Sequence, residues 1–180
     1  DIEVQGEAAA EDVRVLELSA LKGVFGQLVD DPVSYVNAPL MAKSRGVEVH
    51  LATTPETADH RSGVTVQTTQ VDGAQVRVAG TTVGPKDEAR LVQIDEFDVE
   101  VAITDHMAFL GYIDKPGVVG KLGRILGDEG INIAGMQVGR TDAGGRALTV
   151  LTVDSAVPNA AMDTIVTEIG AGYGKAVDLA

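Results

Sequence analysis

From His106 onward, strand and helix patterns follow one another in a regular order, and this order limits the possible folds more than any other feature of the chain. Apolar residues alternate in four segments and recur every three or four positions in two others. The resulting order is β-α-β-β-α-β, which predicts a ferredoxin-like sandwich with two helices on one four-stranded sheet. The predicted segments are 107–113, 118–129, 131–140, 147–153, 158–169 and 173–179.

The residues before this segment have a less regular pattern that also mixes strands and helices. Asp72-Gly73 separates two β-branched runs and predicts a tight hairpin, because this dipeptide tolerates positive φ. The whole chain is therefore predicted to be α+β, with an α/β region followed by the ferredoxin-like region. Predicted strands cover 2–7, 13–18, 47–53, 63–71, 74–83, 88–94 and 97–103, and predicted helices cover 19–28 and 33–43.

Charge is distributed unevenly along the chain. Residues 1–105 carry 8 basic and 19 acidic side chains, whereas residues 106–180 carry 6 and 8. This asymmetry predicts two domains, 1–105 and 106–180. The total charge of −13 and the aromatic content of 3% argue against a nucleic-acid partner, which needs basic and stacking side chains.

Composition excludes several further classes. The chain has no cysteine, so disulfides, thiolate nucleophiles and cysteine-ligated metal clusters are excluded, and no metal site is predicted. No apolar run is long enough to span a bilayer, and the acidic first residues do not resemble a signal peptide. We therefore expect a cytoplasmic location without membrane partners.

The corner between segments 107–113 and 118–129 contains the sequence Asp-Lys-Pro-Gly. Pro116 suits the first helical turn, where its missing N–H costs nothing. The N–H groups of Gly117, Val118 and Val119 then have no intrahelical acceptor, and the helix dipole favours an anion beside them. We expect these amides to hold a carboxylate.

Polar side chains near this corner complete a candidate site. Tyr112 and Asp114 alternate along the strand and are expected on one side, where Asp114 would hold an ammonium group. Asn132 begins the next strand and is expected at the opposite end of the sheet within one chain. If two chains pair antiparallel along that edge strand, the partner's Asn132 reaches the Tyr112 end. The pattern thus predicts an amino-acid site shared by a dimer.

Each of these features also has an interpretation without a ligand. Asp114 is a common turn residue beside Pro-Gly, and Asn132 is an ordinary loop residue after a glycine. Gly120, Gly123 and Gly127 lie on one helix face and permit close packing, although each costs about 1 kcal/mol relative to alanine.

These residues resemble those of an ACT domain, the amino-acid-sensing module at the C-terminus of D-3-phosphoglycerate dehydrogenases. The ACT resemblance covers 112–140, 147–153 and 176–179. The earlier stretches 21–23, 35–39 and 42–47 resemble the intervening domain of the long-form bacterial enzymes.

The resemblance implies a parent enzyme that oxidises 3-phosphoglycerate with NAD in the first committed step of L-serine biosynthesis. L-serine would bind between paired ACT domains as a feedback inhibitor, through Tyr112, Asp114 and Asn132. It also implies a homo-oligomer, a dimer or tetramer, attached to catalytic domains. Some members have a second anion site of basic residues in the intervening domain, but here the corresponding stretch, 95–100, is acidic.

No catalytic or cofactor site is predicted within these residues. The glycine-rich run 170–174 precedes a strand rather than a helix, so it does not match a dinucleotide fingerprint. His50, His60 and His106 are scattered and suggest no catalytic set. Two alternatives stay open: a structural oligomerisation module without a ligand, and the small subunit of an iron–sulfur L-serine dehydratase, whose Ser-Ser-His-Thr stretch is missing here.

Overall fold

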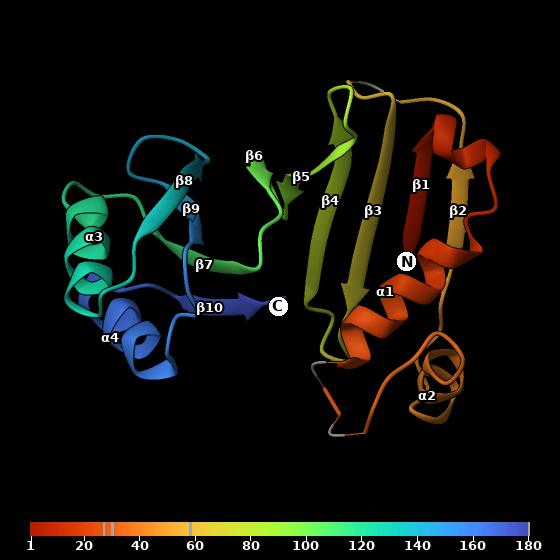
Figure 1. Cartoon of the computed structure of the whole chain (residues 1–180), viewed down its shortest axis with the longest axis horizontal. Helices are drawn as coiled ribbons and strands as arrows, with labels where there is room; N and C mark the ends of the chain where they lie inside the picture. The colour runs from red at the N-terminus through yellow and green to blue at the C-terminus, as the bar shows by residue number, and fades with distance from the viewer. Residues whose placement is uncertain (27, 30, 58, 180) are drawn as a thin grey trace. The chain divides into compact units, whose positions relative to one another are not determined.

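The computed structural model describes residues 1–26, 28–29, 31–57 and 59–179. The chain forms two compact units, residues 1–87 and 88–180, whose elements are labelled in Figure 1. Strands β5 (Glu88–Ile94) and β6 (Phe97–Ala102) belong to the second unit because β6 packs on its sheet. The predicted domain boundary near residue 105 stays a prediction.

The first unit contains a sheet with the strand order β2-β1-β3-β4. Strand β1 pairs parallel with β2 and antiparallel with β3, and β3 and β4 form the predicted hairpin around Gly73, whose φ is 85°. Helix α1 packs on α2 through Leu21, Phe25, Ala38 and Ala42. The elements are β1 (Ile2–Gly6), the 3-10 helix η1 (Glu7–Ala10), α1 (Arg14–Gly26), α2 (Ala38–Ser44), β2 (Leu51–Thr54), β3 (Ser62–Thr69) and β4 (Gln75–Val83).

The predicted strand over 13–18 is wrong, because these residues begin helix α1. The β-branched residues suggested a strand, but the spacing of Leu21 and Phe25 lets one helical face be buried, and packing outweighs local propensity. The carboxylate of Asp12 accepts the N–H of Arg14 at 3.1 Å at the start of this helix, so the helix begins five residues before the predicted start at residue 19. Gln27, in the predicted helix 19–28, lies outside the described residues.

Helix α2 is shorter than the predicted helix over 33–43 and begins at Ala38. The side chain of Asn37 accepts the N–H of Ser34 at 2.7 Å, and this local turn replaces the first predicted helical turn. Strand β2 likewise begins at Leu51 rather than at residue 47.

The second unit has the predicted ferredoxin-like order, with the sheet β10-β7-β9-β8 and both helices on one side of it (Figure 1). Strands β7 and β8 are parallel to each other, since both pair antiparallel with β9. Fully buried Leu110, Leu122, Leu151 and Ile165 lie in the core between the sheet and the helices. The elements are β7 (His106–Ile113), α3 (Val118–Asp128), β8 (Ile133–Arg140), β9 (Arg146–Val153), α4 (Asn159–Ile169) and β10 (Tyr173–Asp178).

The opposite face of this sheet is covered by the β5–β6 hairpin. Both of its strands were predicted, over 88–94 and 97–103, but their packing on this sheet was not. Phe97 and Val99 pack with Met107, Leu148 and other apolar residues of the sheet in a second buried cluster. Strand β9 is therefore buried on both faces from Ala147 to Val153. In the part of the chain that the structure describes, no helix is long and apolar enough to cross a membrane.

Candidate functional site

Helix α3 begins with a left-handed glycine at the corner that the sequence singled out. Gly117 has φ 92°, and its carbonyl accepts the N–H of Lys121 at 3.1 Å, so the helix begins at Val118. The N–H groups of Val118, Val119 and the residue after them have no intrahelical acceptor. Pro116 precedes the cap instead of occupying the first turn as predicted, because the positive φ of Gly117 separates it from the right-handed helix.

The carboxylate of Asp114 lies beside this helix start and already contacts a cation. Oδ2 of Asp114 is 3.2 Å from Nη1 of Arg140, at the end of β8. The side chain of Asp114 is only 24% exposed, whereas that of Arg140 is 58% exposed. Arg140 was not among the predicted site residues. The parallel strands β7 and β8 end at the same edge of the sheet, and this brings Arg140, the last residue of β8, close to Asp114, which follows β7.

Tyr112 points into the core beneath the helices and has a buried partner. Its hydroxyl lies 2.9 Å from Oγ1 of Thr149, and the two residues are 6% and 0% exposed. The hydroxyl of Tyr112 therefore pairs with a buried hydroxyl of β9 and stabilises the fold. The sequence had suggested only a ligand contact for this side chain.

Asn132 lies at the other end of the sheet, as expected. It precedes Ile133, which pairs with Val153, whereas Tyr112 pairs with Ala147. The Nδ2 of Asn132 donates to Asp154 at 2.8 Å. One chain therefore brings Asp114, Tyr112 and the α3 amides to one corner but leaves Asn132 distant from them.

Strand β8 is an edge of the four-stranded sheet, as the sequence predicted. Met136 and Val138 on this strand are 41% and 39% exposed. Among the described residues no strand pairs with its outer edge, so its backbone groups are available to another strand.

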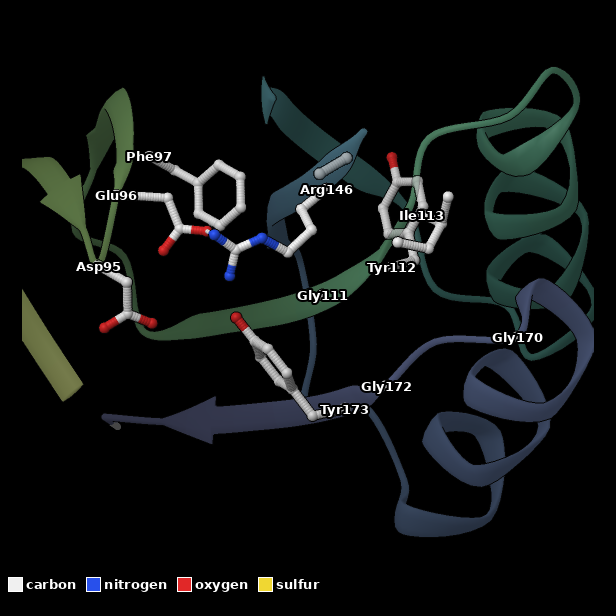
Figure 2. Close-up of a pocket in the computed structure, with 11 residues that line it drawn as sticks. Asp95, Glu96, Phe97, Gly111, Tyr112, Ile113, Arg146, Gly170, Gly172 and Tyr173 are labelled. Carbon is white, nitrogen blue, oxygen red and sulfur yellow. Dashed lines mark ion pairs between the residues drawn. The ribbon is translucent and has the colours of Figure 1, made fainter. Parts of the chain in front are cut away.

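A hollow of about 360 Å³ lies on the sheet face that carries the hairpin (Figure 2). No local sequence pattern predicts it. Its rim includes Asp95 and Glu96 of the β5–β6 turn, and Nη2 of Arg146 lies 2.9 Å from Oε1 of Glu96. Burial, followed by the charges of Asp95 and Glu96, raises the pKa of Tyr173 above its ordinary value. A Cβ at Gly111 would overlap the Tyr173 ring, so glycine is needed beneath it.

Two family models match the chain. The model of the D-3-phosphoglycerate dehydrogenase intervening domain matches residues 1–95, and the ACT domain model matches residues 106–169. The chain belongs to the D-3-phosphoglycerate dehydrogenase family. The relatives named D-3-phosphoglycerate dehydrogenase include those of Mycobacterium leprae, 36% identical over 99% of this chain and 34% of their own length, and Mycobacterium tuberculosis, 37% identical over the same shares.

Relatives from other groups of organisms also match this chain, but the match covers only part of each relative. The Bacillus subtilis D-3-phosphoglycerate dehydrogenase is 33% identical over 85% of this chain and 29% of its own length. The chain thus spans about a third of the length of these relatives.

The corner and the hollow share Tyr112, but the hollow also includes residues outside the two family matches. Tyr112, Asp114 and Asn132 all lie in the ACT match. The hollow combines Glu96, between the two matches, with Tyr173, beyond the ACT match. No contiguous motif therefore contains it. In the described part of the chain, no group of three or more histidine or acidic side chains is arranged to hold a metal ion.

Proposed function

We propose that this chain is the regulatory part of an NAD-dependent D-3-phosphoglycerate dehydrogenase and that it binds L-serine where two ACT domains meet. The parent enzyme would oxidise 3-phosphoglycerate in the first step of L-serine biosynthesis, and L-serine would inhibit it. Catalytic residues and the NAD site would lie in the remainder of the parent enzyme.

The observation that carries this proposal is the joint placement of an anion site and a carboxylate at the start of α3. The free N–H groups after Gly117 and the helix dipole favour a carboxylate ligand. Asp114, at the end of β7, is suited to an ammonium group. The ammonium and carboxylate groups of an amino acid are both attached to Cα. They can therefore bind at two neighbouring sites, one that favours a cation and one that favours an anion.

The edge position of β8 supports a site shared by two copies. Antiparallel pairing of two β8 strands would place the beginning of one strand beside the end of the other. Asn132 of the partner would then approach the end that carries Arg140 and Asp114. Its amide can donate to or accept from the ligand hydroxyl, which would favour serine over alanine.

A ligand-free oligomerisation module is the second candidate, and one observation favours it. The side chains of Tyr112, Asp114 and Asn132 each contact a neighbour within the chain, so the fold uses all three without a ligand. This candidate predicts dimers along β8 that do not respond to any amino acid.

Calorimetry of the 180-residue chain with L-serine, glycine and L-alanine distinguishes the two candidates. We expect heat with L-serine, and about ten- to hundredfold weaker binding in Asp114→Asn, since a hydrogen bond to a charged group is lost. Asp163→Asn, an exposed carboxylate on α4, is the matched control and should bind like the parent chain. Sedimentation shows whether dimers form. Dimers without heat from any amino acid would favour the structural module.

A further inference from the structure

The turn that joins β8 to β9, residues 140–146 and here called the β8–β9 turn, is bonded both to the proposed serine corner and to the β5–β6 hairpin. On the side of the corner, the N–H of Asp114 donates to the carbonyl of Gly145 at 2.8 Å. On the side of the hairpin, Nη2 of Arg146 lies 2.9 Å from Oε1 of Glu96 (Figure 2). One short segment therefore touches the site and the element that covers the other face of the sheet.

Hydrogen bonds within the β8–β9 turn connect its two ends. The N–H of Thr141 donates to the carbonyl of Arg146 at 2.9 Å, and the N–H of Arg146 donates to Oγ1 of Thr141 at 3.1 Å. Because the turn is short and closed by these bonds, a shift of Arg140 at its beginning displaces Arg146 at its end. A long loop without such bonds would absorb the same shift.

The end of β8 also packs directly on the hairpin. Gly139 is buried, and a Cβ at this position would lie 3.1 Å from Cβ of Phe97 and 3.2 Å from the carbonyl oxygen of Asp98. Glycine is therefore needed for this close approach. Since successive side chains of a strand point to opposite faces, position 139 faces the hairpin and the side chain of Arg140 faces Asp114. A movement of Arg140 thus acts on the packing of the hairpin.

The ion pair between Arg140 and Asp114 gives the end of β8 two arrangements. Without a ligand, the carboxylate of Asp114 holds the guanidinium group at 3.2 Å. In the proposed function the ammonium group of L-serine takes the same carboxylate. The side chain of Arg140 is 58% exposed, so water can solvate the released guanidinium group. Ligand binding would therefore remove one of the contacts that fix the end of β8.

We propose that the β8–β9 turn couples amino-acid binding at the corner to the packing of the β5–β6 hairpin on the sheet. This inference rests on the proposed function, because the ligand acts by displacing Arg140 from Asp114. Release of Arg140 loosens the end of β8 and the contact between Arg146 and Glu96, so the hairpin packs less firmly when the ligand is bound. The coupling is reciprocal, and a change that loosens the hairpin favours ligand binding. The hairpin begins at residue 88, the first residue of the second unit, so the effect of the ligand reaches the point where the chain enters this unit.

The first test needs no ligand and compares hydrogen exchange at the hairpin amides, residues 88–102, in variants of the 180-residue chain. Arg140→Gln should make these amides exchange about two- to fivefold faster, the effect of losing one exposed ion pair. Arg140→Lys keeps a cation for the single contact with Asp114 and should exchange like the parent chain. Arg124→Gln removes exposed ion pairs on α3 and is the matched control. Unchanged exchange in Arg140→Gln, or an equal change in the control, would overturn the coupling.

The second test adds L-serine and separates the coupling from the proposed function. Where calorimetry shows binding, saturating L-serine should speed exchange at the hairpin amides, and Glu96→Gln should bind L-serine about two- to fivefold more tightly. Glu100→Gln, an exposed carboxylate on β6, is the control and should bind like the parent chain. Binding without any change at the hairpin would overturn the coupling and leave the proposed function intact. Absence of binding would contradict the proposed function, whereas hairpin exchange in Arg140→Gln would still decide whether the turn links the corner to the hairpin.

Discussion

The hydrogen bond between Tyr112 and Thr149 allows a sharp separation of structural and ligand-binding roles. Tyr112→Phe removes one hydroxyl and leaves Oγ1 of Thr149 in a fully buried position without this partner. We expect a loss of about 1–3 kcal/mol in stability, the usual cost of leaving a buried polar group unsatisfied. Because the hydroxyl points into the core, L-serine affinity should change little.

The magnitude can be isolated with a double-mutant cycle. Thr149→Val removes the other hydroxyl and keeps the β-branched shape, so it should cost a similar amount. The double variant removes both polar groups and should be less destabilised than the sum of the single variants. We expect an interaction free energy of about 1–2 kcal/mol.

The chain has two units, so global unfolding need not be two-state. Native-state hydrogen exchange at amides of β7 and β9 assigns the change to the second unit, and urea unfolding followed by circular dichroism provides the overall value. Strictly additive single effects would refute the reasoning about the buried pair. A tenfold loss of serine affinity in Tyr112→Phe would show that its hydroxyl contacts the ligand instead.

Three further predictions concern Arg140 at the corner and the contacts of Tyr173. Arg140→Gln removes an exposed ion pair worth about 0.2–1 kcal/mol, which competes with the ammonium group of L-serine for Asp114. Calorimetry should therefore show up to about fivefold tighter L-serine binding. Weaker binding would mean that Arg140 itself contacts the ligand. Gly111→Ala forces the Tyr173 ring to move and should destabilise the second unit by about 1–3 kcal/mol in hydrogen exchange, a cost that Tyr173→Ala in the same chain should remove. Ultraviolet titration should show that the pKa of Tyr173 in the folded chain is higher than that of free tyrosine. Because the tyrosine of the unfolded chain ionises first, the free energy of unfolding should fall as the pH rises above the pKa of free tyrosine. Glu96→Gln should lower the pKa of Tyr173, and an unchanged pKa would argue against an effect of the Glu96 charge on Tyr173.

Local sequence patterns were sufficient to predict a helix or strand where its buried residues recur at regular spacing. Helix α3 was predicted to within one residue, because Val118, Leu122 and Leu126 repeat at helical spacing and are all buried. The same reasoning failed at residues 13–18, where β-branched residues suggested a strand but burial of Leu21 and Phe25 decided for a helix.

For the candidate site, the sequence identified which groups carry chemistry but not which groups they contact. It located the corner before α3, although not the left-handed conformation of Gly117, and it placed Asn132 at the opposite end of the sheet from Asp114. It did not indicate Arg140 or Thr149 as partners, because these contacts join residues 26 and 37 positions apart.

The sequence by itself determined the order of elements in the second unit and the backbone amides exposed at the start of α3, since both depend on neighbours within a few residues. Only the tertiary structure decided that the β5–β6 hairpin covers the second face of the sheet and encloses a pocket with Tyr173. That arrangement depends on apolar burial between distant segments, and the hydrophobic effect has no direction that a local pattern could reveal.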